Sequence, residues 1–173
     1  MAKIHPFRAI RPTRDKVHLV AARPFYSYKP NVLEAKLEDN PFTFLHIINP
    51  EYGNEASTKA NTLNRFELVS KGYTDFLNRG ILFQDDLPSI YIYKQSKPGN
   101  VFTGVVCGAS VDEYINDSIK KHEATLTSRE QMFTDYLDIV GYNAEPVLLA
   151  HKSSKEIENL LNLITTVRAE YEF

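Results

Sequence analysis

Residues 89–111, SIYIYKQSKPGNVFTGVVCGASV, hold the clearest structural signal in the chain. Aromatic and β-branched residues fill both ends of this stretch, which is typical of β-strands. Residues 97–100, KPGN, have the composition of a tight turn. The stretch therefore predicts a β-hairpin. Gly104 and Gly108 in its second strand indicate either a bulge or the close approach of another backbone.

Helical patterns lie on both sides of this hairpin. Apolar residues recur at helical spacing within residues 57–78, 128–140 and 153–167, which predicts amphipathic helices there. Residues 31–40 predict a shorter helix that ends before a proline, and residues 111–117 predict a short helix or turn. Each of these helices needs a neighbouring surface on which to bury its apolar face.

The remaining apolar runs predict short strands. Residues 3–10 predict a strand at a sheet edge, because Pro6 interrupts it. Residues 17–25 and 42–48 predict two further strands, and residues 145–152 predict a short apolar one. Since the strands and helices do not alternate strictly, we expect an α+β fold, with a mixed or antiparallel sheet flanked by helices.

The composition is that of an ordinary globular protein. With 173 residues, 43% hydrophobic and 24% charged, we expect a single domain over residues 1–173. The net charge of −2 argues against a general nucleic-acid-binding protein. No apolar run reaches the roughly 20 residues of a membrane span, and no signal core is present, so we expect a cytoplasmic protein without membrane attachment. A single cysteine, Cys107, and scattered histidines predict neither a disulfide nor a metal site.

Residues 115–130, INDSIKKHEATLTSRE, contain the best candidate site. Lys120, Lys121 and His122 form a basic cluster that suits the oxygens of a phosphate group. Lysine supplies a compact positive charge, and histidine can donate a hydrogen bond to an oxygen. The cluster therefore predicts a phosphate-binding site.

The helix that follows this cluster offers a second place for an anion. Thr127 or Ser128 is expected to cap its N-terminus, where free N–H groups and a partial positive charge attract anions. Arg129 lies in the first turn, an unfavourable position for a cation, which invites a functional explanation. Glu123, beside His122, could act as a general base or bind a metal.

An alternative interpretation of residues 115–130 is an exposed, solvated charge run between two elements. The chain contains no Walker loop and no GxGxxG or HExxH motif. Residue types alone therefore do not separate a site from a solvated loop.

The stretch ARPFYSYKP at residues 22–30 is a second candidate. Pro24 and Pro30 bracket a group of aromatic side chains that begins with Phe25 and Tyr26. Aromatic residues in a proline-stiffened loop can line a ligand cleft, so Pro24, Phe25 and Tyr26 are candidate cleft residues. The alternative is that these rings pack over the edge of the sheet.

Several longer motifs occur in a characteristic order. They are KIHPFRAIRPT (3–13), VAARPF (20–25), NPFTFLHIINPE (40–51), SIYIYKQ (89–95) and IKKHEATLTSRE (119–130). In this order they resemble the domain-of-unknown-function 1015 family of bacterial and archaeal proteins, over essentially the whole chain. The most specific element is KKHE with the following Thr125 and Arg129.

The chain departs from this family in two ways. Many members carry Pro-Tyr-Asp after the second strand, whereas Phe25 and Tyr26 follow Pro24 here, so a carboxylate is missing. Family members are usually much longer, and their later half carries an Asp-Gly-His-His-Arg signature that resembles ParB/sulfiredoxin-like nucleotide-binding proteins. Because this sequence lacks that signature, the resemblance implies the N-terminal portion of a longer protein or a shortened relative.

The first functional hypothesis is phosphate or nucleotide handling related to phosphoryl transfer, which the resemblance implies. Its partner would be a nucleotide or a phosphorylated small molecule, and its cofactor a nucleotide with magnesium. The phosphate-binding residues would be Lys120, Lys121, Thr125 and Arg129, and the catalytic residues His122 and Glu123. Phosphoryl transfer depends mainly on positioning and charge stabilisation, which such residues can supply.

The second hypothesis is a non-catalytic binding or assembly module. The helix predicted at residues 153–167 has an apolar face, which we expect to be buried. That face consists of Ile157, Leu160, Leu161, Ile164 and Val167. In this hypothesis the helix docks onto a second domain or subunit, either in a homodimer or in a missing C-terminal half.

Overall fold

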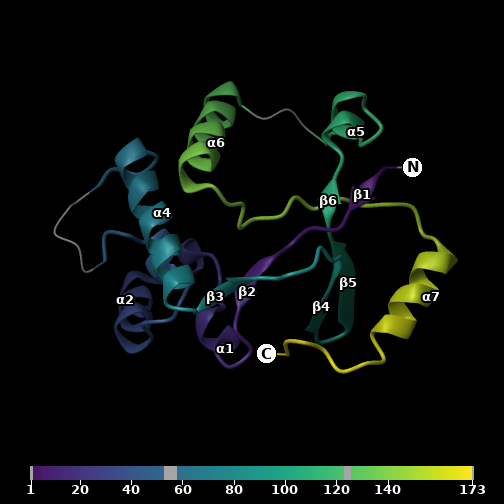
Figure 1. Ribbon diagram of the computed structural model, residues 1–173, viewed down its shortest axis with the longest axis horizontal. Helices are drawn as coiled ribbons and strands as arrows, with labels where there is room; N and C mark the ends of the chain where they lie inside the picture. Colours follow the sequence, from purple (N-terminus) through teal and green to yellow (C-terminus); the bar gives the residue numbers. More distant parts are fainter. Residues whose placement is uncertain (1, 53–57, 123–125, 173) are drawn as a thin grey trace. The chain divides into compact units, whose positions relative to one another are not determined.

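A computed structural model describes residues 2–52, 58–122 and 126–172 (Figure 1). The described chain groups into two compact units, and each unit combines separate stretches of sequence. The first unit holds residues 2–9, 84–122 and 144–172, and the second holds residues 10–52, 58–83 and 126–143. The expectation of a single domain stays a prediction.

The second unit is mainly helical. Its helices are α1 (Val17–Val20), α2 (Pro30–Asp39), α3 (Leu45–Ile48), α4 (Leu63–Asn78) and α6 (Thr127–Val140). Strand β2 (Ile10–Pro12) pairs with β3 (Leu82–Gln84), and the chain leaves the unit within β3. The core consists of the buried residues Val20, Ile47, Phe66, Val69, Phe76, Ile81, Leu82 and Val140.

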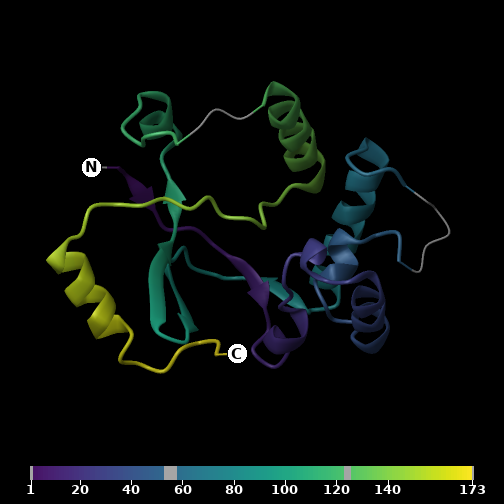
Figure 2. The same cartoon turned by 180° about the vertical axis from the view of Figure 1, so that it is seen from behind.

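Helix α4 organises this core, and it contacts α3 and α6. Phe66, Val69 and Phe76 recur at helical spacing and are buried, which confirms the apolar face predicted for this helix. The rings of Phe66 and Tyr136 meet edge to face, with centroids 5.1 Å apart. Helices α4 and α6 lie side by side in both views of the ribbon (Figures 1 and 2).

The first unit contains two antiparallel strand pairs. Strands β4 (Tyr91–Lys97) and β5 (Asn100–Val106) form the predicted hairpin, and Lys97 pairs with Asn100 at the turn. Strand β1 (Ile4–His5) pairs with β6 (Gly108–Ala109). Gly108 lies opposite His5, whose carbonyl oxygen would be 3.5 Å from an added Cβ, so another backbone does approach this glycine. The helices are α5 (Val111–Ile115) and α7 (Lys155–Ile164).

The α+β fold is confirmed, but three predicted strands are wrong. Residues 17–25 contain the short helix α1, residues 42–48 contain α3, and residues 145–152 form neither helix nor strand. Short apolar runs are compatible with either type of structure. Before α3, a local hydrogen bond favours a turn over a strand, because the Asn40 side chain accepts from the Phe42 N–H at 3.0 Å. In the described residues the strands form three separate pairs.

Across the described part of the chain, no helix has the length and apolar character needed to span a bilayer.

Candidate functional site

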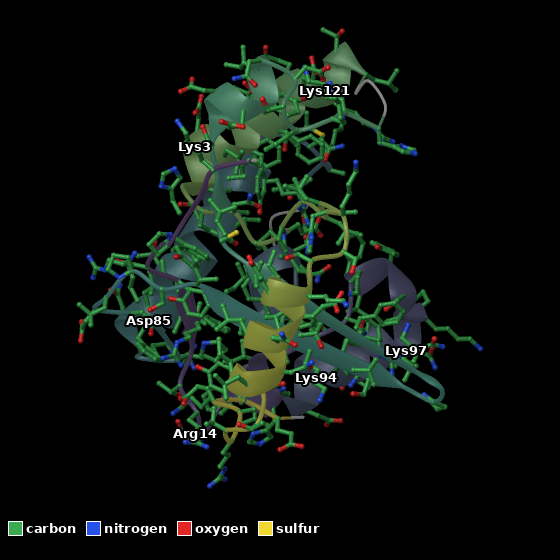
Figure 3. The ribbon with its side chains drawn as sticks, turned by 90° about the vertical axis from the view of Figure 1, so that its right-hand side faces the viewer. Lys3, Arg14, Asp85, Lys94, Lys97 and Lys121 are labelled. Carbon is green, nitrogen blue, oxygen red and sulfur yellow. The ribbon has the colours of Figure 1, made fainter. Side chains whose placement is uncertain are left out.

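The basic cluster begins just after α5, on a tight turn. Asp117 has a φ of 62°, a left-handed conformation that aspartate tolerates. The turn lets Lys120 Nζ donate a hydrogen bond to Asp117 Oδ2 at 2.8 Å. That hydrogen bond, together with the charge of Lys120, holds the pKa of the Asp117 carboxyl below its ordinary value. Lys121 Nζ lies 4.4 Å from the centroid of the Tyr114 ring, a cation–π contact. Figure 3 labels Lys121.

The cations of this cluster are exposed and partly engaged by groups of their own loop. Lys120, Lys121 and His122 all lie at the surface. Exposed ion pairs contribute little to stability, so an incoming anion could compete for Lys120. Glu123 and Thr125, the predicted catalytic carboxylate and phosphate-binding hydroxyl, lie outside the described residues, and their roles stay predictions.

Arg129 belongs to the second unit, in the first turn of α6. The cap predicted at Thr127 or Ser128 is wrong, because Leu126 is the N-cap residue, and its side chain makes no capping hydrogen bond. The extended backbone of Leu126 lets its carbonyl oxygen accept from Arg129 N at 2.8 Å and from Glu130 N at 3.1 Å. Among the described residues, no side chain at the N-cap of α6 accepts from the first N–H groups of the helix.

An open cavity of about 510 Å³ lies beside this helix start. Its lining residues are Asn61, Ser128, Arg129, Met132 and Phe133. The guanidinium of Arg129 and the hydroxyl of Ser128 supply the donors, and Met132 with Phe133 supplies an apolar wall. Such a surface can bind an anion with an apolar or aromatic part.

The aromatic loop forms a compact turn in the second unit. Residues Phe25–Ser27 make one 3-10 turn, in which Ser27 Oγ donates to the Pro24 carbonyl at 2.7 Å. The rings of Phe25 and Tyr26 meet edge to face at 5.8 Å, and Tyr26 is 77% exposed. A cavity of about 200 Å³ is lined by Tyr28 of this loop, but not by Pro24, Phe25 or Tyr26. A ligand-binding role for those three stays a prediction.

Helix α7 departs most from what the sequence predicts. Ser154 caps it by accepting a hydrogen bond from Ile157 N at 3.5 Å, but no residue of the helix is buried. Leu160 is 56% exposed, and Leu148 in the preceding segment is 95% exposed. The expectation that the apolar face of residues 153–167 is buried is therefore wrong for the described chain, which presents that face to solvent.

The hairpin also exposes large apolar side chains, which the sequence interpretation did not single out as functional. Tyr93 and Phe102 are each 60% exposed. Tyr93 pairs with Gly104 and Gln95 pairs with Phe102, so Tyr93 and Phe102 are diagonal neighbours on one face. The unbroken apolar run at residues 90–93 could have indicated that both faces of the hairpin carry apolar groups, because successive side chains of a strand point to opposite faces.

A polar cluster at the start of the hairpin secures the N-terminal segment. Tyr91 donates from its hydroxyl to Asp85 Oδ2 at 2.7 Å, and the same hydroxyl accepts from Ala9 N at 3.0 Å. Arg8 Nε donates to the Asp85 carbonyl at 2.7 Å. These groups satisfy one another and hold the structure of the unit. Among the residues described, no three His, Cys, Asp or Glu side chains are grouped to hold a metal ion.

Comparison with known proteins places the chain in one family. No curated protein and no solved structure gives a significant match. The family model described as "Protein of unknown function (DUF1015)" matches residues 4–173. Because this match covers nearly the whole sequence, as the order of the motifs from KIHPFRAIRPT to IKKHEATLTSRE indicated, the chain belongs to the DUF1015 family.

Proposed function

We propose that this chain is a non-catalytic binding module that docks through helix α7 onto the surface of another polypeptide. The observation that carries the proposal is the exposed apolar face of α7, here called the α7 stripe. It consists of the exposed residues Ile157, Leu160 and Ile164 and of the half-buried Leu161 between them. Contiguous exposed apolar groups of this kind are typical of interaction surfaces.

Helix geometry makes the α7 stripe a suitable docking surface. Residues at positions i, i+3, i+4 and i+7 lie on one side of a helix, and the stripe follows this spacing. Complete burial of one leucine or isoleucine side chain stabilises a complex by about 1.5–3 kcal/mol. Because these side chains are already partly covered, docking would gain roughly 1 kcal/mol from each, before the entropic cost of association.

The proposal is tested by photo-crosslinking in cells that produce the protein. A photoreactive residue replaces Leu160 or Ile164 in the stripe, and Asn159 or Asn162 on the opposite face serves as the matched control. We expect adducts of defined mass from the stripe positions and none from the control positions. Adducts in equal yield from both faces, or none from the stripe, would refute docking through α7.

A second candidate function is phosphate or nucleotide binding, which the cavity at the start of α6 favours. Arg129 and Ser128 line this cavity at the N-terminus of α6, where the N-cap residue Leu126 supplies no side-chain hydrogen bond. A guanidinium beside a helix N-terminus is a common arrangement for phosphate groups. Lys120 and Lys121 support this function less, because their ammonium groups already contact Asp117 and Tyr114.

Thermal shifts with inorganic phosphate, ATP, ADP and CTP, each with and without magnesium, test this second candidate. A ligand at 100 times its Kd stabilises the protein by about 2.7 kcal/mol, which raises Tm by roughly 5–10 °C for a chain of this size. The Arg129→Met variant should lose the shift, whereas Arg14→Met, which removes an exposed arginine elsewhere in the same unit, should keep it. No shift with any of these ligands would remove the candidate.

A further inference from the structure

We propose that the partner of α7 is a second copy of this chain, whose β4–β5 hairpin receives the α7 stripe. This inference rests on the proposed function and adds the identity of the partner. Both surfaces belong to the first unit of every copy, and both are exposed there except at Leu161, which is half-buried. A dimer with two-fold symmetry would bury the two surfaces of each copy in two identical contacts.

The receiving surface is the face of the hairpin that carries Tyr93, here called the aromatic face. The strand register places Tyr93 and Gly104 opposite each other, with Gln95 and Phe102 as the next pair on the same side. Nothing lies within 4 Å of a Cβ added at Gly104. The glycine therefore leaves a notch between two exposed rings, into which a leucine or isoleucine of a helix can fit.

Only the outer part of the aromatic face is open. Near the base of the hairpin, Phe7 covers the ring of Tyr91, with centroids 5.2 Å apart and an edge-to-face geometry. Towards the turn, Tyr93 and Phe102 keep 60% of their surface exposed. Large aromatic side chains supply much of the contact energy in protein interfaces, so this outer part is the expected centre of the contact.

Charges on the two surfaces are complementary. Lys97 lies on the aromatic face, since it pairs with Asn100 two residues beyond the Gln95–Phe102 pair. On α7, Glu156 and Glu158 flank Ile157, so each lies about 100° away from it around the helix axis, at the two borders of the stripe. A docked helix would bring these carboxylates to the rim of the contact, where Lys97 can pair with one of them.

Lys94 provides a matched control for this charge. It lies on the same strand as Lys97, and Figure 3 labels both lysines on the hairpin. The register pairs Lys94 with Thr103, so Lys94 lies on the opposite face from Tyr93 and Lys97. Reversal of its charge changes the net charge equally without placing a carboxylate on the aromatic face.

Sedimentation equilibrium of the purified chain and of charge-reversed variants tests the second-copy contact. We expect a monomer–dimer equilibrium that Lys97→Glu weakens about tenfold or more, while Lys94→Glu changes it less than about twofold. The double variant Glu156→Lys/Glu158→Lys should weaken dimerisation as Lys97→Glu does. An equimolar mixture of these two weakened variants should dimerise as well as the wild type, because both contacts of the mixed dimer again join opposite charges.

The mixing experiment distinguishes a contact between two copies from other contacts that would bury the α7 stripe. Docking of α7 onto the hairpin of its own copy would leave the mixture as monomeric as each variant alone, which would overturn the inference. A wild-type chain that stays monomeric at all concentrations would overturn it as well. If crosslinks from Leu160 then join a different polypeptide, the second-copy inference fails while the docking function of α7 stands.

Discussion

Replacement of Leu160 by serine tests whether α7 belongs to the folded core. The side chain is 56% exposed, so less than half of its surface is covered. Complete burial of a leucine is worth about 1.5–3 kcal/mol, so its loss here should lower the free energy of unfolding by roughly 1 kcal/mol or less. The reference variant is Ile47→Ala, because Ile47 is 0% exposed in the core of the second unit. That change should cost about 2–5 kcal/mol.

Urea unfolding, followed by circular dichroism in protein too dilute to associate, measures the free energy of unfolding of Leu160→Ser and of Ile47→Ala. The slope of unfolding free energy against urea should be the same for each variant and the wild type, so that midpoints can be compared. A loss of 2 kcal/mol or more in Leu160→Ser would mean that the monomer buries the stripe, as the sequence pattern predicted. Such a result would refute the reasoning behind α7 docking.

Three further changes test local features of the second unit. Gly141→Ala should lower the free energy of unfolding by about 1 kcal/mol in urea, because Gly141 ends α6 with a φ of 76°. Gly72→Ala, inside α4, should raise this free energy by about 0.5–1 kcal/mol. If both glycine variants lower the free energy of unfolding, the explanation from backbone conformation is wrong. Burial raises the pKa of the Glu51 carboxyl, but hydrogen bonds from Thr58 and Arg65 outweigh it and leave this pKa below its ordinary value. Glu51 therefore contributes stability above its unfolded pKa, and that contribution is lost as the pH falls through the lower folded pKa. Melting temperatures of Glu51→Gln and wild type should differ at pH 7 and converge at low pH; a constant difference would contradict the assignment.

Local signals predicted the elements that carry their own start and stop residues. The hairpin follows from its aromatic and β-branched strands and from the turn at residues 97–100, where Gly99 has a φ of 80°. Helix α6 ends at Gly141 as its sequence pattern indicates. In both cases the residues that decide the conformation are close neighbours in the chain, so no distant contact is needed to predict it.

The strand predicted at residues 42–48 is wrong because its apolar residues reflect burial, which a helix satisfies as well as a strand does. Leu45 and Ile47 are completely buried, as a core strand would be, but they lie on the single helical turn α3. A side chain in contact with the core needs an apolar group in either conformation. The Asn40 side chain accepts from Phe42 N, and the Thr43 hydroxyl accepts from Leu45 N, which fixes the local backbone instead. Asn40 also donates to the Leu19 carbonyl, a bond that requires the tertiary structure.

The candidate site was only partly predictable, because the contacts of its side chains depend on the backbone conformation around them. Charge and residue type marked Lys120, Lys121 and Arg129, but the partners Asp117 and Tyr114 depend on the left-handed turn after α5. The N-cap of α6 at Leu126, instead of at Thr127 or Ser128, likewise follows from the extended backbone of Leu126, which the sequence pattern did not indicate.

The sequence by itself determined the family, the α+β class, and the amphipathic character of α4, α6 and α7. Tertiary structure decided which of these apolar faces is covered. The buried face of α4 packs with Val140 and the partly buried Met132 and Tyr136 of α6 in the core of the second unit, whereas no residue of α7 is buried. The physical reason is that periodicity defines an apolar face within a single helix, but burial requires a second surface, which only the assembled chain can provide.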